Sequence, residues 1–62
     1  MQKHIYRLSH TVAGARRLLV VVVMDSEASR EQIIAAAHAR YGIRRDVTER
    51  AEIEHRPAQV AA

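Results

Sequence analysis

The hydrophobic residues of the chain are concentrated in residues 18–24, whose sequence is Leu-Leu-Val-Val-Val-Val-Met. Four of these seven residues are Val, and β-branched side chains favour an extended strand over a helix. Arg16 and Arg17 precede the stretch and Asp25 follows it. A short apolar run between charged residues predicts a strand that is buried on both faces. It is too short for a membrane-spanning helix, which needs about 20 apolar residues.

Two further segments, residues 3–12 and 47–56, alternate between polar and apolar residues, as strands with one solvated face do. The apolar members that share a face are Tyr6, Leu8 and Val12 in the first segment, and Val47, Ala51 and Ile53 in the second. Gly14 permits the positive φ of a tight turn, so the first segment and the apolar strand are predicted to form a hairpin. We expect the last strand to end before Pro57 and residues 57–62 to form a flexible tail.

Between the apolar strand and the last strand, residues 26–41 have the pattern of a helix. Ser29 and Gln32 have the spacing of a capping box, in which each residue satisfies a backbone amide of the other. The apolar stripe at helical spacing consists of Ile33, Ile34, Ala37 and Tyr41. Gly42 is the expected stop, because glycine readily adopts the left-handed conformation that ends a helix.

These elements predict an α+β fold, with a single small domain over residues 1–56 in the order β-β-α-β. The predicted architecture is a three-stranded mixed sheet with one helix packed on one face. The helix would return the chain in a right-handed crossover, so that the third strand runs parallel to the second. We place the apolar strand at the centre, because central strands are buried on both faces. An order with the first strand at the centre stays open.

One helix covers one face of such a sheet, so one apolar set of the central strand would have no helix over it. That set consists of Leu19, Val21 and Val23, and the neighbouring strands would add Arg7, Arg50 and Arg56 to the same face. An apolar stripe with a charged rim is typical of a binding surface. The sequence therefore predicts that these six residues bind a partner protein. A domain of 62 residues often gains stability by association, so a homodimer is also expected.

The charge balance is mildly basic, with ten Lys and Arg residues against seven Asp and Glu residues and a net charge of +3. The predicted layout brings Arg16, Arg17, Arg44 and Arg45 to one end of the fold, as a basic edge able to contact phosphates. This edge supports an alternative function, that of a basic dimeric nucleic-acid-binding protein. Against it, the chain has two Tyr and no Phe or Trp, so it lacks the stacking platform of single-strand binders.

Enzymatic, metal-binding and cofactor-binding patterns are absent from the sequence. The chain has no Cys, which excludes disulfides and thiolate ligands. His4 and His10 would share a strand face about 20 Å apart, too far to bind one ion. There is no glycine-rich phosphate loop and no paired nucleophile and base. We therefore expect no enzyme activity, no cofactor and no metal. The lack of Cys and of a signal-peptide cleavage pattern favours a cytoplasmic protein with no membrane partner.

In size and layout the chain resembles small phage-encoded inhibitors of the anti-CRISPR type. The residues that carry the resemblance are the hairpin 3–24, the capped helix 26–41 and the strand 47–56, without a sequence motif. The resemblance implies a stoichiometric inhibitor of a bacterial RNA-guided nuclease complex, whose partner is a subunit of that complex. Many such inhibitors are acidic mimics of nucleic acid, whereas the basic balance here points to an acidic protein surface or an apolar groove. The expected function is thus that of a small, non-enzymatic protein-interaction module.

Overall fold

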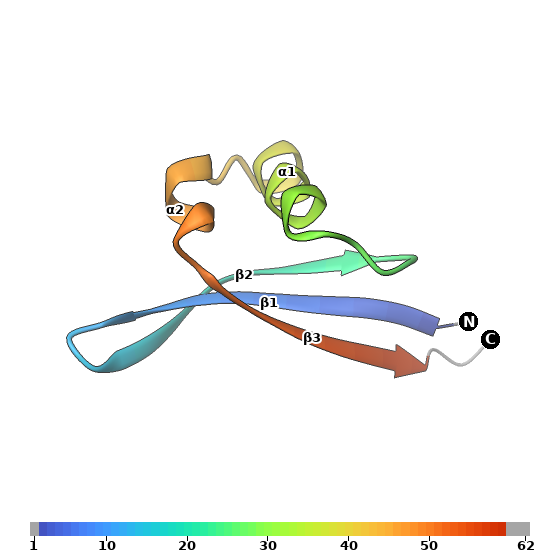
Figure 1. Ribbon diagram of the computed structural model, residues 1–62, viewed down its shortest axis with the longest axis horizontal. Coiled ribbons are helices and arrows are strands. Elements are labelled where there is room, and N and C mark those ends of the chain that lie inside the picture. The colour runs from blue at the N-terminus through green and yellow to red at the C-terminus, as the bar shows by residue number, and fades with distance from the viewer. Residues whose placement is uncertain (1, 60–62) are drawn as a thin grey trace.

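The computed structural model describes residues 2–59, which form a three-stranded antiparallel sheet with two helices on one of its faces (Figure 1). The elements follow in the order β1 (Gln2–Val12), β2 (Ala15–Met24), α1 (Arg30–Tyr41), α2 (Arg45–Glu49) and β3 (Glu52–Gln59). The structure therefore has a small α+β fold, as expected from the sequence. No helix within residues 2–59 is long and apolar enough to cross a membrane.

The strand order is β2-β1-β3, so the central strand is β1 and not the apolar β2. β1 is antiparallel to both of its neighbours. β2 and β3 therefore run in the same direction, as predicted, but they lie on opposite sides of β1. The preferred prediction of a mixed sheet with β2 at its centre is wrong, and the order with the first strand at the centre is found. The prediction that β2 is buried on both faces is also wrong, because Leu18 and Val23 are exposed. An apolar run favours a strand, but it specifies neither how many strands pair with its backbone nor whether both of its faces are covered.

The hairpin between β1 and β2 has a two-residue turn, Ala13-Gly14. Val12 pairs with Ala15, and the turn residues have φ values of 51° and 80°. Positive φ at both positions is the mark of a type I′ turn, whose twist matches that of the flanking strands. Gly14 adopts this conformation freely, as predicted, whereas the Cβ of Ala13 makes it unfavourable there.

α1 begins with the capping box that the sequence predicts. Gln32 N donates to Ser29 Oγ at 3.3 Å, and Ser29 N donates to Gln32 Oε1 at 2.9 Å. The helix therefore begins at Arg30, four residues later than the expected start at residue 26. Gly42 ends it with a φ of 68°, as expected. Ser29 and not Ser26 is the N-cap residue, because only Ser29 has a glutamine three residues later that completes the capping box.

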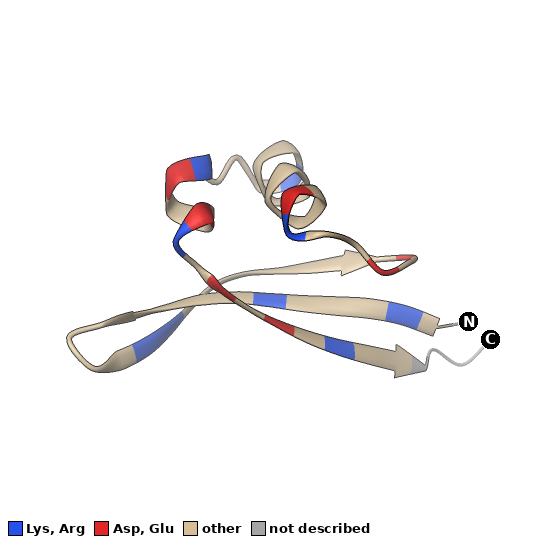
Figure 2. Ribbon diagram, in the orientation of Figure 1, with Lys and Arg blue, Asp and Glu red and all other residues tan. Residues whose placement is uncertain are grey.

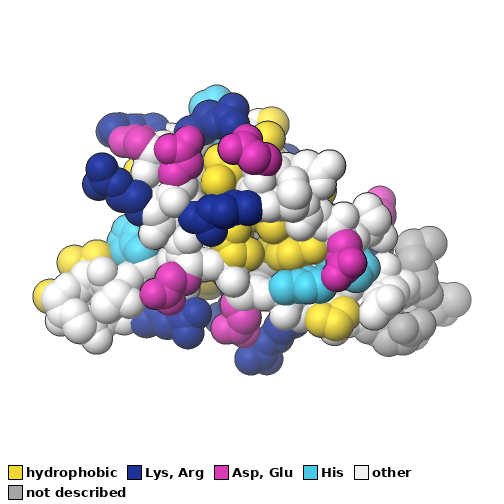
Figure 3. Space-filling model, viewed as in Figure 1, with side chains coloured by type: hydrophobic (Ala, Val, Ile, Leu, Met, Phe, Trp, Pro, Cys, Tyr) yellow, Lys and Arg dark blue, Asp and Glu magenta, His cyan; other side chains and the backbone are white. Residues whose placement is uncertain are grey.

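The core lies between α1 and the side of the sheet that faces it, where Figure 3 shows apolar side chains between the helical layer and the sheet. Its buried members are Tyr6, Leu8, Val22, Ile33, Ala37 and Ala51. The buried ring of Tyr6 keeps its hydroxyl satisfied, because Ala28 N donates to Tyr6 Oη at 2.9 Å. Ile33, Ile34 and Ala37 are buried, as the helical stripe predicts, but Tyr41 is 54% exposed at the last turn of α1.

The last strand differs from the prediction at both ends. Residues 45–49 form the short helix α2, so Val47 lies in a helix, and β3 begins only at Glu52. β3 then continues through Pro57, because an edge strand can place a residue without an N–H on its unpaired side. The expected tail is thus strand at residues 57–59, and residues 60–62 lie outside the described part of the chain.

β2 contains a β-bulge at Leu19. Leu8 pairs with Val20 whereas Ser9 pairs with Leu18, so Leu19 is an extra residue opposite the β1 backbone. Leu19 and Val20 both pack against the core cluster. The bulge therefore interrupts the alternation of β2 and turns Leu18, instead of Leu19, to the face away from the helices.

Candidate functional site

The face of the sheet opposite α1 and α2 has no helix of residues 2–59 over it (Figure 1). Directly paired residues of an antiparallel sheet share a face, so the strand register assigns the members of this surface. They are Lys3, Ile5, Arg7, Ser9 and Thr11 from β1, Arg16, Leu18, Val21 and Val23 from β2, and Glu52, Glu54, Arg56 and Ala58 from β3. We call this surface the open face.

The apolar part of the open face lies along β2. Leu18 is 52% exposed and Val23 is 44% exposed, and Val21 between them is half-buried. We call these three residues the apolar stripe. Ile5 of the central strand pairs with Val23 and extends the stripe towards β1. Contiguous exposed apolar side chains on one strand are a feature of surfaces that bind other proteins.

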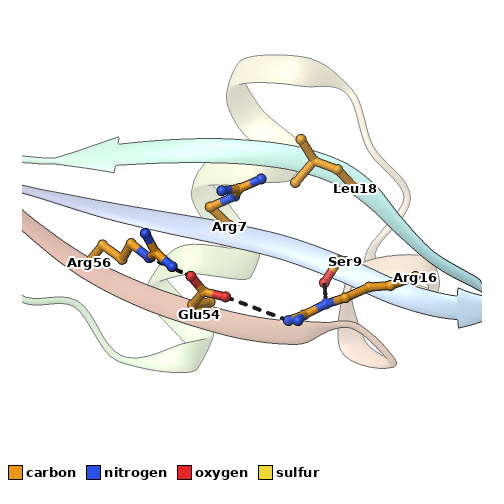
Figure 4. Close-up of a pocket in the computed structure, with 6 residues that line it drawn as sticks. All are labelled: Arg7, Ser9, Arg16, Leu18, Glu54 and Arg56. Carbon is orange, nitrogen blue, oxygen red and sulfur yellow. Dashed lines mark hydrogen bonds and ion pairs between the residues drawn. The ribbon is translucent and has the colours of Figure 1, made fainter.

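Beside the stripe, the open face contains a shallow hollow of ≈ 270 Å³ (Figure 4). Its lining residues are Arg7, Ser9, Arg16, Leu18, Glu54 and Arg56. Glu54 lies between two arginines: Arg56 Nε donates to Glu54 Oε1 at 2.6 Å, and Arg16 Nη2 is 3.7 Å from Glu54 Oε2. The hydrogen bond from Arg56 holds the pKa of Glu54 below its ordinary value, so this carboxylate stays charged at neutral pH.

Ser9 is the hydroxyl-bearing residue of the hollow, and it is buried although no helix covers it. Arg16 Nε donates to Ser9 Oγ at 3.0 Å, so the Arg16 side chain lies over the hydroxyl. The same guanidinium is 3.8 Å from Glu52 Oε2. Arg16 is thus held by β1 and β3 together, and Ser9 has a structural role under it.

Arg7 lies in the middle of the open face, on the central strand. Its cross-strand neighbours are Val21 on one side and Glu54 on the other. In Figure 4 its guanidinium points towards β2 and Leu18, away from the Glu54 carboxylate. Within residues 2–59 no ion pair or side-chain hydrogen bond involves Arg7. Its five N–H donors are therefore available to a carboxylate supplied from outside the chain.

Four of the six residues predicted to bind a partner lie on the open face, namely Arg7, Val21, Val23 and Arg56. The prediction is wrong for Leu19, which packs against the core because of the bulge, and for Arg50, which is the C-terminal cap of α2. Arg50 lines a second hollow, on the α2 side, with His10 and Asp46 among its neighbours. Sequence reasoning missed Leu18, Arg16 and Glu54 as members of the surface. Nothing in the sequence marks the bulge that brings Leu18 there.

The four arginines predicted to form one basic edge are not brought together (Figure 2). Arg16 lies on the open face, paired with two glutamates of β3, whereas Arg44 and Arg45 lie at the start of α2 on the other side of the sheet. Arg44 donates to Asp46 at 2.6 Å and lowers the pKa of that carboxyl, and Arg45 is 3.6 Å from a glutamate of α1. Arg17 is the member with no ion pair inside the described residues. Their charge is therefore largely neutralised locally.

The histidines form a pair that the sequence does not reveal. The register of β1 with β3 brings His4 Nδ1 to 2.9 Å from His55 Nε2, and the Tyr6 ring stacks on His55 with centroids 4.6 Å apart. His4 and His10, the pair considered from the sequence, do not meet. Within residues 2–59 no group of three or more His, Cys, Asp or Glu residues is placed to hold a metal ion.

Comparison of the chain with known protein families, with curated proteins and with solved structures finds no match. The groups that the open face offers are an apolar stripe, one guanidinium with open donors and a set of paired charges. Such groups recognise another surface by burial and charge. The chemistry that this arrangement supports is therefore binding.

Proposed function

We propose that this chain is a small, non-catalytic protein-interaction module that binds a partner protein through the open face. The observation that carries the proposal is the exposed apolar stripe of Leu18, Val21 and Val23 beside the open donors of Arg7. Complete burial of an exposed aliphatic side chain contributes roughly 1.5–3 kcal/mol, so three of them can anchor a complex. Arginine beside an apolar anchor is also typical of the residues that dominate interface energetics.

The charges of the open face favour one kind of partner within this proposal. Arg16 and Arg56 are already neutralised by Glu52 and Glu54 together, so Arg7 is the positive charge in the middle of the face that needs an outside partner. A carboxylate of the partner protein would bind it in bidentate fashion. The partner is therefore an acidic protein surface with an apolar ridge or groove next to a carboxylate.

A narrower form of the proposal names the partner as a subunit of a bacterial RNA-guided nuclease complex, which this chain inhibits stoichiometrically. What supports it is the layout of a hairpin, a capped helix and a final strand in a chain of 62 residues, together with an open sheet face. A stoichiometric inhibitor needs an adhesive surface and no catalytic residue, which fits the groups found on the open face.

The experiment mixes the purified chain with purified bacterial RNA-guided nuclease complexes and measures complex formation and cleavage of target DNA. We expect Arg7→Glu and Leu18→Asp to weaken binding by roughly tenfold or more while circular dichroism stays unchanged. Arg50→Glu is the matched control, because it makes the same charge reversal on the α2 side. If none of the complexes binds or is inhibited, the narrower proposal is wrong. If Arg7→Glu and Arg50→Glu behave alike, the open face is not the binding surface.

Nucleic acid is the competing partner in this experiment. Binding to phosphates releases counterions from the nucleic acid, so its affinity falls steeply as the salt concentration rises. The affinity of an apolar contact depends little on the salt concentration. Three arginines of the proposed basic edge are ion-paired within the chain and lie on two sides of the sheet, which disfavours this alternative. Tight, strongly salt-dependent binding to a duplex of about 20 base pairs would favour nucleic acid over a protein partner.

A further inference from the structure

His4 and His55 bring two imidazole nitrogens together on the helix side of the sheet. His4 Nδ1 lies 2.9 Å from His55 Nε2, although the two residues are 51 positions apart in the chain. The register pairs Tyr6 with His55, so His4 is a diagonal neighbour of His55 on the same face. The pair is formed by the first strand and the last, and spacing along the sequence therefore gives no sign of it.

The histidine pair rests on a buried aromatic ring. The Tyr6 ring stacks on His55 with an interplanar angle of 13°, and Tyr6 is itself 3% exposed. The centroids of the His4 and His55 rings are 5.1 Å apart. His4 is half-buried and His55 is exposed, so a solute reaches the two nitrogens from the side of His55.

The spacing of the two nitrogens is that of neighbouring ligands on one metal ion. Imidazole nitrogens bind first-row divalent ions such as Zn²⁺ at about 2.0–2.1 Å. Two such ligands are about 2.8–3.0 Å apart when they meet the ion at a right angle, and about 3.3–3.4 Å apart at the tetrahedral angle. The observed 2.9 Å matches the right angle, which is the geometry of tetragonal Cu²⁺ and Ni²⁺ complexes.

We propose that His4 Nδ1 and His55 Nε2 together bind one divalent ion of tetragonal preference, Ni²⁺ or Cu²⁺, with water in the other coordination positions. Without the ion, one ring donates its N–H to the other. On binding, the hydrogen between the two nitrogens moves to the other nitrogen of the same ring, so two neutral imidazoles stay neutral and both facing nitrogens present a lone pair. The broad preference of histidine χ2 lets the rings turn until both lone pairs point at the ion.

The bound ion links β1 to β3. β3 pairs with β1 alone among the described strands, and the two ligands meet only when these strands are paired. An ion that binds the folded chain and not the unfolded chain stabilises the fold. The site lies on the opposite face of the sheet from Arg7, so this proposal and the proposed partner contact can fail separately.

Isothermal titration calorimetry of the full chain with Ni²⁺ at pH 7.5 measures the site. We expect one ion per chain with a dissociation constant in the micromolar range. His4→Gln and His55→Gln each remove one ligand and should raise the dissociation constant roughly tenfold or more. His10→Gln is the matched control, because His10 is also half-buried and lies on the same strand and the same face as His4. It should leave binding unchanged, as should Arg7→Glu.

Two further measurements separate ion binding from a change in the fold. Ni²⁺ at about five times its dissociation constant should raise the midpoint of thermal unfolding by roughly 4–8 °C in the unmodified chain and in His10→Gln, and not in either ligand variant. His55→Gln loses the ring that stacks on Tyr6, so circular dichroism must show that it is folded. Nuclear magnetic resonance needs no variant: paramagnetic Cu²⁺ below one equivalent should broaden the ring signals of His4 and His55 before those of His10 and His38.

Three outcomes would overturn the proposal. Absence of saturable Ni²⁺ binding up to about 1 mM would mean that the pair is a hydrogen bond and not a metal site. An equal loss of affinity in His10→Gln, or equal broadening of all four histidines by Cu²⁺, would show scattered binding to single imidazoles. Weaker binding in His4→Gln together with unchanged binding in folded His55→Gln would show that His55 is not a ligand.

Discussion

β2 and β3 occupy equivalent places in the sheet, one on each side of β1, and yet their side chains differ sharply. β3 alternates Glu52, Glu54 and Arg56 on the open face and continues into Pro57. Charges and proline are the usual protection of an edge strand. β2 presents the apolar stripe on the same face, and its central residues include no charge. One edge of the sheet is therefore protected by charges and proline, whereas the other has only the bulge at Leu19 and the hydrogen bond from Arg40 to the Val23 carbonyl oxygen.

The difference between β2 and β3 shows whether the fold requires apolar side chains on the open face. Both strands pair with β1, and neither has a helix over its open face. The polar open face of β3 shows that the sheet forms without apolar residues on that side. The fold therefore does not require Leu18, Val21 and Val23 to be apolar. Exposed apolar groups of this kind are typical of surfaces that associate with another molecule, which supports the proposed function.

The largest expected effect compares the two faces of β2 itself. Val22 is fully buried against the helices, so Val22→Asp leaves a carboxylate without a partner in the core. We expect a loss of about 4 kcal/mol or more in the free energy of unfolding, which is on the scale of the total stability of such a small domain. Val21→Asp is the matched control, since its carboxylate stays on the open face opposite Arg7.

Urea unfolding followed by circular dichroism measures both variants. Val21→Asp should remain folded and should weaken binding of the proposed partner protein, because the contact would have to desolvate the new carboxylate. If Val21→Asp also unfolds, both faces of β2 belong to the core and the difference between the edge strands has no functional meaning.

The next effect concerns the apolar stripe of β2. Val21→Lys adds to β2 the kind of charge that β3 already carries and places an ammonium group in the proposed contact beside Arg7. We expect the dissociation constant of the complex with the partner protein to rise roughly tenfold or more, with the fold retained. Ala58→Lys adds the same charge to the open face at β3 and should have a smaller effect on binding. Equal effects of the two lysines on the dissociation constant would mean that the apolar stripe is not the contact.

The sequence predicts the elements that depend on local patterns. The apolar run, the Ser29–Gln32 capping box and the stops at Gly14 and Gly42 mark β2, α1 and the hairpin turn, and the structure confirms them. These features are set by propensity and by hydrogen bonds between residues close in sequence. Local physics is therefore sufficient to recognise most of the elements.

The misassigned features depend on contacts between distant segments. Strand order depends on which backbone edge meets β1, and hydrophobicity reports only the burial of side chains. Residues 45–49 form too short a helix to show a periodic pattern, so the alternation of polar and apolar residues places residue 50 on a strand. The bulge at Leu19 places Leu18 instead of Leu19 on the open face. The members of the open face that alternation places correctly, such as Arg7 and Val21, lie in regular parts of β1 and β2.

A smaller effect is expected at the hairpin turn, where a substitution should change the stability of the fold without changing the binding of a partner. Ala13 has a φ of 51°, which costs an L residue with a Cβ roughly 1 kcal/mol, whereas asparagine tolerates it in a type I′ turn. Ala13→Asn should raise the free energy of unfolding by about 0.5–1 kcal/mol. Ala13→Val should lower it, because β-branched side chains are poorly accommodated there. Both variants should bind the proposed partner protein normally when folded, and a changed dissociation constant would link the turn to the open face.

The smallest expected effect concerns the charges that protect β3. The hydrogen bond from Arg56 lowers the pKa of Glu54 in the folded chain, with smaller contributions from Arg16 and Arg7. A carboxyl whose pKa is lower when folded binds more protons when unfolded, so its stabilising contribution is present above the unfolded pKa and is lost as the pH falls through the folded pKa. Urea unfolding from about pH 6 to about pH 3 should therefore show a steeper acid loss of stability in the unmodified chain than in Glu54→Gln. Because the Glu54 side chain is partly exposed to solvent, the difference should also shrink with added salt. If the two curves fall in parallel, the Glu54 cluster does not stabilise the fold, and its place on β3 is explained by edge protection alone.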